Sequence, residues 1–244
     1  MSIRTVFGFL SPKSLKTQKD GRKLIEAISS TIPDLLPSKY DDSEPIRRVF
    51  NLNQLDDALQ LWGDGLLWST LKPKSIGRYY ASTPHGLHDA VYISIEGDVS
   101  GEKLADLLKK VSSIYDVTIG YVHRIYDAEK KNIEYYKNHV MPFSQGLTTH
   151  DLRTGIPGIC WAMYFGRPYL NLFGKDRLLS APVYSAIKIE DGVYLQVNSK
   201  ITDPENNYEG FNNARERIKQ HLNCSAFSTS KGEEINIPDY GIEK

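Results

Sequence analysis

The stretch PGICWAMYFGRPYLNLFGKDRLLSAPVYSAIKIEDGVYLQV, residues 157–197, decides the fold. Its large side chains are too numerous to stay in water, because burying one stabilises the folded state by roughly 1.5–3 kcal/mol. Pro168 suits a first helical position and Gly174 a helix end, so the spacing predicts a short helix over Tyr169–Phe173. Alternating residues on both sides of Asp191-Gly192 predict a β-hairpin. This predicted fold nucleus contains no obvious catalytic group.

The composition is that of a soluble globular protein with no charge bias. Of 244 residues, 30 are Lys or Arg and 30 are Asp or Glu, which gives no basic stripe of the kind that duplex-binding proteins carry. No apolar run approaches the roughly 18 residues of a membrane span, and the N-terminus lacks the apolar core of a signal peptide. Cys160 and Cys224 indicate buried thiols in a reducing compartment. We therefore expect a cytoplasmic protein that binds neither nucleic acid nor membrane.

Periodicity predicts the remaining elements. Strands are expected over 3–10, 90–96 and 116–124, with a last strand at 226–229. Helices are expected over 17–31, from Asn53 to Trp62, from Ser100 to Val111, over 126–140 and over 209–223. Residues 37–45 indicate a loop, 66–80 an irregular aromatic segment, 82–88 a turn and 231–244 a loosely held tail.

These elements favour an α+β fold. We expect an antiparallel or mixed sheet with helices packed mainly on one face, in two loosely similar halves. A break near 141–156 is the best linker candidate. Because no clean boundary separates the halves, we interpret residues 1–244 as a single domain.

Two clusters could hold a metal ion. His85, His88 and Asp89 offer two imidazoles and a carboxylate, but they fall in a predicted turn without a further His/Cys pair. Glu129 and Lys131 satisfy part of a restriction-type nuclease motif, but they fall in a charged helix pattern that favours a solvated surface. A metal-dependent nuclease or hydrolase built on either cluster is the alternative hypothesis. The favoured interpretation is a protein without catalytic residues, metal or other cofactor.

An acidic stretch with two tryptophans indicates a protein interface. The candidate contact residues are Asp41, Asp42, Glu44, Asp56, Asp57, Trp62, Asp64 and Trp68. An acidic face speeds encounter with a basic partner, and a large aromatic side chain can anchor the contact. The opposing interpretation is a solvated surface for the acids and a core position for the aromatics.

Several motifs carry a resemblance to a known family. They are WAMYFGRPY (161–169), LFG (172–174), LLSAP (178–182) and DGVYLQ (191–196), and, before them, Tyr40, Glu44-Pro45, Trp62, Trp68 and Pro84-His85. From about residue 37 onward the chain resembles bacterial polymorphic-toxin immunity proteins of the immunity protein 52 family.

The resemblance implies a small cytoplasmic α+β protein, encoded beside a toxin, that binds this toxin and blocks it. The associated toxins are commonly predicted nucleases of the restriction-endonuclease type. No catalytic residue is implied, and the matched motifs do not fix the contact residues. The sequence leaves the oligomeric state open.

Overall fold

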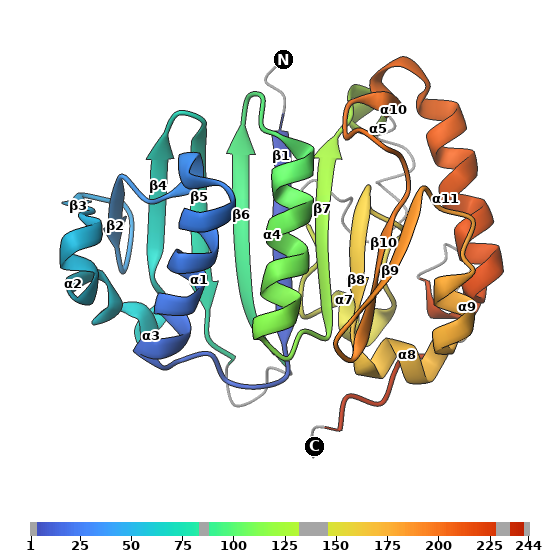
Figure 1. Ribbon diagram of the computed structural model, residues 1–244, viewed down its shortest axis with the longest axis horizontal. Coiled ribbons are helices and arrows are strands. Elements are labelled where there is room, and N and C mark those ends of the chain that lie inside the picture. Colours follow the sequence, from blue (N-terminus) through green and yellow to red (C-terminus); the bar gives the residue numbers. More distant parts are fainter. Residues whose placement is uncertain (1–3, 83–87, 132–145, 228–234, 242–244) are drawn as a thin grey trace.

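The computed structural model describes residues 4–82, 88–131, 146–227 and 235–241. Strands from these ranges form one ten-stranded sheet in which all neighbouring strands are antiparallel (Figure 1). Their order across the sheet is β3 (Arg48–Val49), β2 (Lys39–Asp41), β4 (Leu67–Leu71), β5 (Lys74–Tyr80), β6 (Asp89–Glu96), β1 (Arg4–Ser11), β7 (Ile119–Ile125), β8 (Ala162–Phe165), β10 (Gly192–Gln196) and β9 (Ser185–Ile189). The predicted α+β class is confirmed, with the antiparallel form of the sheet.

The helices lie between these strands in the chain. They are α1 (Gln18–Thr31), α2 (Leu55–Leu59), α3 (Trp62–Gly65), α4 (Gly101–Ile114), α5 (Asp127–Lys131), α7 (Asp151–Thr154), α8 (Arg167–Phe173), α9 (Lys175–Leu179), α10 (Asp203–Asn206) and α11 (Tyr208–Leu222). Short 3₁₀ turns occur at Pro33–Leu35, Leu52–Gln54 and Cys224–Ala226. None of the described helices is long and apolar enough to cross a membrane.

Hydroxyl side chains cap the start of the long helices α1 and α4. The Thr17 hydroxyl accepts a hydrogen bond from the Asp20 amide at the start of α1, and the Ser100 hydroxyl accepts one from the Lys103 amide at the start of α4, both at 3.2 Å. The helix α8 begins at Arg167, so Pro168 is its second residue and not its first as predicted, and Gly174 ends the helix with a φ of 85°. Local chemistry therefore fixes where these helices start and stop.

The hairpin of β9 and β10 forms one residue earlier than its sequence suggests. Its turn residues are Glu190 and Asp191, and Glu190 takes the positive φ of 47°. Gly192 belongs to β10 instead, because its missing side chain leaves room for Tyr164: a Cβ there would lie 2.2 Å from the Tyr164 ring. Packing against β8 thus overrides the turn preference of the Asp-Gly pair.

One face of the sheet, which we call the helical face, is covered by α1 to α4. Phe9 of β1 stacks on Tyr115, which follows α4, at 5.4 Å between ring centroids. Tyr79 of β5 stacks on Trp62 of α3 at 4.6 Å. In Figure 1 α1 and α4 lie across the front of the sheet. This face carries a continuous core along the strands.

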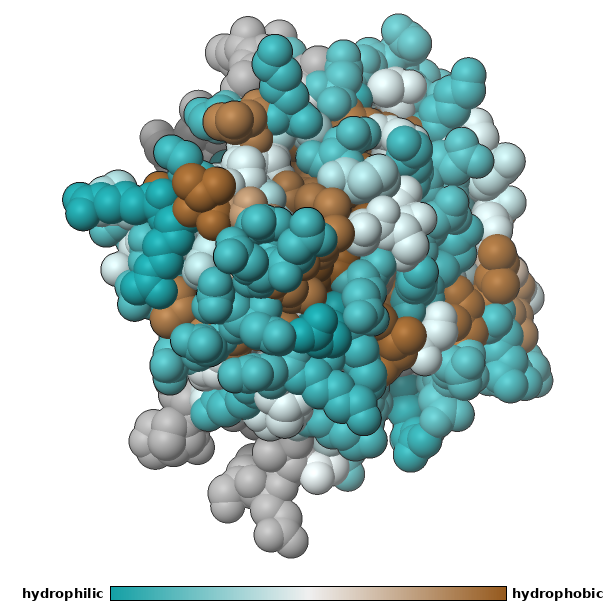
Figure 2. Space-filling model, turned by 60° about the vertical axis from the view of Figure 1, so that its left-hand side comes forward, coloured by the Kyte–Doolittle hydropathy of each residue, from teal (hydrophilic) through white to brown (hydrophobic). Residues whose placement is uncertain are grey.

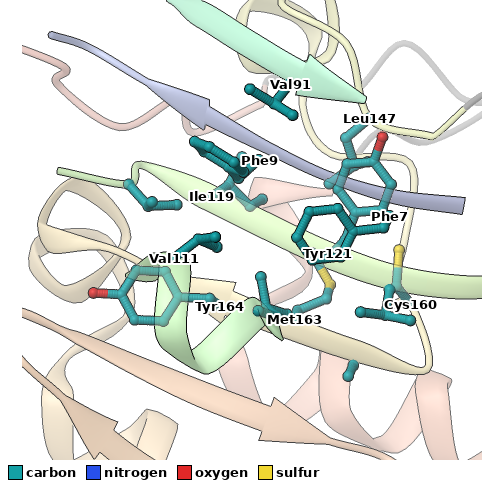
Figure 3. Close-up of a cluster of buried hydrophobic side chains, with 14 of the residues drawn as sticks. Phe7, Phe9, Val91, Val111, Ile119, Tyr121, Leu147, Cys160, Met163 and Tyr164 are labelled. Atoms are coloured by element: carbon teal, nitrogen blue, oxygen red, sulfur yellow. The ribbon is translucent and has the colours of Figure 1, made fainter. Parts of the chain in front are cut away.

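On the opposite face, the described helices cover the C-terminal half of the sheet. Phe165 of β8 contacts Tyr169 and Phe173 of α8, and His123 of β7 stacks on Phe211 of α11. Figure 3 shows the dense packing around β1, β7 and β8, where Tyr121, Cys160 and Met163 are buried. The prediction of helices mainly on one face therefore describes the N-terminal half, whereas the C-terminal half has helices on both faces.

The largest error of the sequence prediction lies in residues 66–80, which form the hairpin of β4 and β5 and not an irregular segment. Trp68 pairs with Gly77 across this hairpin, and a Cβ on Gly77 would lie 2.0 Å from the Trp68 ring. The alternation of inward and outward residues in β5 is therefore hard to recognise in the sequence, because the inward position Gly77 carries no side chain.

Smaller differences concern the ends of elements. The predicted loop 37–45 contains β2, the predicted helix 53–62 is divided between α2 and α3, and the strand predicted from residue 116 starts at Ile119. Of the predicted helix 126–140 the structure describes α5, and of the predicted strand 226–229 it describes Phe227, which forms a parallel bridge with Ile156. Residues 132–145 and 228–234 lie outside the described residues, as do the ends of the predicted tail.

Candidate functional site

The two tryptophans predicted as interface anchors belong to the core. Trp62 is buried, stacks on Tyr79 and donates its indole N–H to the Leu15 carbonyl oxygen at 2.5 Å. Trp68 is fully buried and lies flat on Gly77. Neither ring has surface to offer a partner, so the anchor role is withdrawn. Both rings serve packing.

The six acidic candidates lie at the β2–β3 turn and on the short helices, mixed with arginines. Asp41 accepts a hydrogen bond from the Arg47 amide at 3.2 Å and lies 3.6 Å from Arg48 Nε. Asp56 pairs with Arg22 of α1. The exposed remainder is Asp42, Glu44, Asp57 and Asp64. Because arginines lie among the acidic residues, this surface carries charges of both signs and is not uniformly acidic.

The candidate metal turn is divided between two faces of the sheet. His88 and Asp89 are neighbours where β6 begins, so their side chains point to opposite sides. The Asp89 carboxylate accepts hydrogen bonds from the Leu15 amide at 2.7 Å, the Tyr79 hydroxyl at 2.5 Å and the Ser82 amide at 2.6 Å. His85 lies outside the described residues. Asp89 thus holds the loops at the end of the sheet together.

His88 is enclosed on the other face. Its Nε2 lies 2.7 Å from the Thr118 hydroxyl, and its ring contacts Tyr240 edge-on at 5.2 Å. Burial lowers the pKa of His88 to about 4, against the opposing influence of Asp89 and Asp116. His88 is therefore neutral at physiological pH, and it serves the contact between β6 and the C-terminal segment.

Glu129 was predicted to lie on a solvated helix face, and this is wrong. Its carboxylate is buried and lies 3.0 Å from His123 Nε2, 3.0 Å from Arg215 Nη1 and 3.1 Å from the Tyr126 amide. Burial acts to raise the pKa of Glu129, but His123, Arg215 and the amide together lower it to about 2. The Lys131 side chain lies outside what the structure describes.

The Glu129 cluster has a defined proton arrangement. The Trp161 amide donates to His123 Nδ1 at 3.2 Å, so the imidazole proton sits on Nε2 and is donated to Glu129. The cluster joins β7, α5 and α11, and its three charged or polar side chains are buried. We interpret it as a polar contact inside the C-terminal core, because a buried carboxylate needs such partners to stay ionised.

Cys160 also belongs to the core. Burial raises the pKa of its thiol well above the usual value, so the thiolate needed for nucleophilic chemistry is disfavoured. This agrees with the buried thiol predicted from the sequence. The Cys224 side chain lies outside what the structure describes.

A feature not predicted from the sequence is the face of β2 to β5 opposite α1 to α4, which we call the open face because no described helix covers it. The face ends at β6, where Ala90 is buried and Asp151 of α7 influences Tyr92. Cross-strand register places Val49, Lys39, Ser69 and Ile76 in one row, with Leu71 and Tyr80 on the same face. Four apolar side chains here are exposed: Val49 by 76%, Leu71 by 75%, and Ile76 and Tyr80 by 45% each. Figure 2, which brings the β3 side forward, shows apolar residues at the surface among hydrophilic ones.

Positive charge accompanies these apolar side chains. Lys39, Lys74 and Arg78 lie on the open face, and Arg4 of β1 joins them in the row of Glu96. The Arg78 guanidinium lies over the Tyr80 ring at 4.6 Å from its centroid. A sheet face with exposed apolar groups and a charged border has the chemistry of a protein-binding surface.

Comparisons with known proteins find a similar fold and no family. No protein-family model and no curated protein matches the chain. Among solved structures, the fold is similar to that of Pseudomonas aeruginosa T6SS protein PA0821, with 13% sequence identity and a TM-score of 0.50. The match covers 98% of this chain and 79% of that chain. At this identity the likeness shows the shared fold alone.

Proposed function

We propose that this protein is an immunity protein, which binds a cognate toxin in the cytoplasm and neutralises it by occluding its active site. Its motifs resemble those of the immunity protein 52 family, and the name of the fold neighbour places that protein in a secretion system. Binding of another macromolecule requires no reacting group. The observation that carries the proposal is this resemblance, together with an exposed apolar sheet face on the same chain.

The contacts of the candidate metal ligands Asp89 and Glu129 favour a binding function over a catalytic one. Asp89 accepts three hydrogen bonds that tie loops together, and Glu129 is enclosed with His123 and Arg215 in the core. A metal-dependent nuclease would need its carboxylates free to bind the ion. These two carboxylates stabilise the fold instead.

The target that the resemblance implies is a nuclease effector. The exposed acids Asp42 and Glu44 would then contact lysines or arginines of its phosphate-binding surface, at the border of the interface. Charges at such a border alter mainly the rate of association. Asp41 is better left intact in experiments, because it holds the Arg47 amide and the β2–β3 turn.

Co-expression tests the proposal directly. The toxin domain encoded in the neighbouring reading frame is expressed in a susceptible bacterium with or without this protein, and growth is measured. We expect growth only when both are present, and weaker protection from the variant Asp42→Lys with Glu44→Lys. The matched control, Glu209→Lys with Glu216→Lys on α11, should protect like the wild type. Absence of protection by the wild type would refute the proposal.

A further inference from the structure

We infer that the open face is the surface on which the toxin docks, with Leu71 and Ile76 at the centre of the contact. This inference rests on the proposed function and names the surface that carries it out. The partner surface that fits is a protein surface with apolar side chains at its centre and carboxylates beside them, opposite Lys39 and Arg78. Both features follow from the side chains that the sheet presents here.

The apolar part of the argument starts from the register of the sheet. Ile76 lies in a row with Ser69, Lys39 and Val49, and Leu71 occupies the next row on the same face. The helical face of the same strands is filled by α1 to α4, so the core does not need these side chains. Exposed apolar side chains gathered on one sheet face promote aggregation unless something covers them.

The charge on this face selects the partner. Within the described residues, Lys39, Arg78 and Arg4 form no ion pair, whereas Lys74 pairs with Glu96 at 3.1 Å. Asp41, the other acid on this face, is engaged with the β2–β3 turn. The chain as a whole has no net charge, so this surplus of positive charge is local. Carboxylates of the partner would complement it.

Arg78 is already arranged for such a contact. Its guanidinium covers the Tyr80 ring, and its Nε is buried without a hydrogen-bond partner among the described residues. A buried donor without a partner costs free energy, and an arriving carboxylate would accept from the same guanidinium. Arginine over tyrosine is also a combination that interfaces favour.

The open face is large enough for the centre of a protein interface but too small for a whole interface. Three strand spacings of about 4.8 Å and seven residues of β5 at about 3.4 Å each give roughly 340 Å² in plan, against about 800 Å² that one partner buries in a standard interface. The contact would therefore extend over the adjoining β2–β3 turn with Asp42 and Glu44. The acids then form the border, and the open face supplies the affinity.

Calorimetric titration of the full chain with the purified toxin domain of the neighbouring reading frame tests the inference. We expect Ile76→Asp to weaken binding by about 30-fold or more, the scale of an interface hot spot. The matched control is Ile187→Asp on β9, at the other end of the sheet, where the isoleucine is exposed by 43% against 45% for Ile76. This control should bind within about threefold of the wild type.

The charge is tested separately from the apolar contact. Lys39→Glu should slow association severalfold at low salt, and high salt should reduce the difference. Far-ultraviolet circular dichroism checks that each variant is folded. If Ile76→Asp does not fold, Leu71→Asp at the more exposed position replaces it and must give the same loss.

The possible outcomes separate the two proposals. If the wild type binds and both Ile76→Asp and Leu71→Asp bind equally well, the open face is not the docking surface, and the proposed function survives. If only Ile187→Asp weakens binding, the contact lies at the β9 end and the inference is wrong. If the wild type does not bind the toxin domain, the inference and the proposed function fall together.

Discussion

The two halves of the sheet use the same antiparallel architecture but differ in how they are covered. All seven residues of β7 are buried, whereas β5 alternates between exposed and buried positions. Residues from α8, α11 and the segment before β8 fill the second face of the C-terminal half. No described helix covers that face over β2 to β5. The difference teaches that one half of the sheet is built for stability and the other leaves a surface available for contact.

The prediction with the largest expected effect removes a buried charge from the C-terminal half of the sheet. Glu129→Gln takes the carboxylate away from Arg215 and His123 in a buried site, and we expect a loss of about 3–5 kcal/mol in the free energy of unfolding. Urea denaturation measures it. The matched control is Glu216→Gln on α11, whose exposed pair with Lys219 should contribute less than about 1 kcal/mol. Equal effects would mean that the cluster does not stabilise the C-terminal core.

The prediction with the next largest effect concerns the pH dependence of stability, to which His88 contributes at the boundary between the halves. The folded pKa of His88, about 4, lies below its ordinary value of 6.5, so unfolding takes up a proton between these values. This contribution to stability is fully present above pH 6.5 and is lost as the pH falls towards 4, to a total of about 3 kcal/mol. Protonation of Glu129, whose folded pKa is about 2, lowers the free energy of unfolding further, but only below about pH 4.5.

The substitution His88→Gln isolates this contribution. Thermal or urea unfolding between pH 7 and 4 should show a shallower pH dependence for His88→Gln than for the wild type. An identical slope in both proteins would show that the His88 environment is more open than its contacts with Thr118 and Tyr240 indicate.

The smallest expected effect concerns the open face. Leu71→Asp should change the free energy of unfolding of the isolated protein by no more than about 0.5 kcal/mol, because the leucine is exposed. Leu195→Asp in β10, where the leucine is buried, should prevent stable folding. Urea denaturation of both variants compares the halves directly. A large loss from Leu71→Asp would show that the open face is covered within the protein itself.

The accuracy of the sequence prediction also differs between the two halves of the sheet. The helix α8 and the hairpin of β9 and β10 were predicted, because Pro168, Gly174 and strict alternation act over a few residues. The strand β8 was not predicted, although its aromatic residues were expected to be buried. The hairpin of β4 and β5 was missed, since Gly77 accommodates Trp68 from the paired strand and interrupts the pattern. The missed hairpin carries three of the exposed apolar residues of the open face. The alternation of Ile76, Arg78 and Tyr80 was the signal that could have revealed it.

The candidate site was predicted in part only. The exposed positions of Asp42, Glu44, Asp57 and Asp64 agree with the sequence, but the arginines among them come from α1 and from the turn itself. The burial of Trp62 and Glu129 could not be read from spacing. Trp62 meets Tyr79, and Glu129 meets Arg215, across long stretches of chain.

By itself the sequence determined the positions of the long helices α1, α4 and α11, the α+β class and the neutral overall charge, because these depend on residue type and on neighbours within one or two turns. Only the tertiary structure decided which carboxylates and rings are buried and which face of the sheet stays uncovered. The physical reason is that burial is set by elements far apart in the chain: α11 closes over β7, while no described helix closes over the open face of β5.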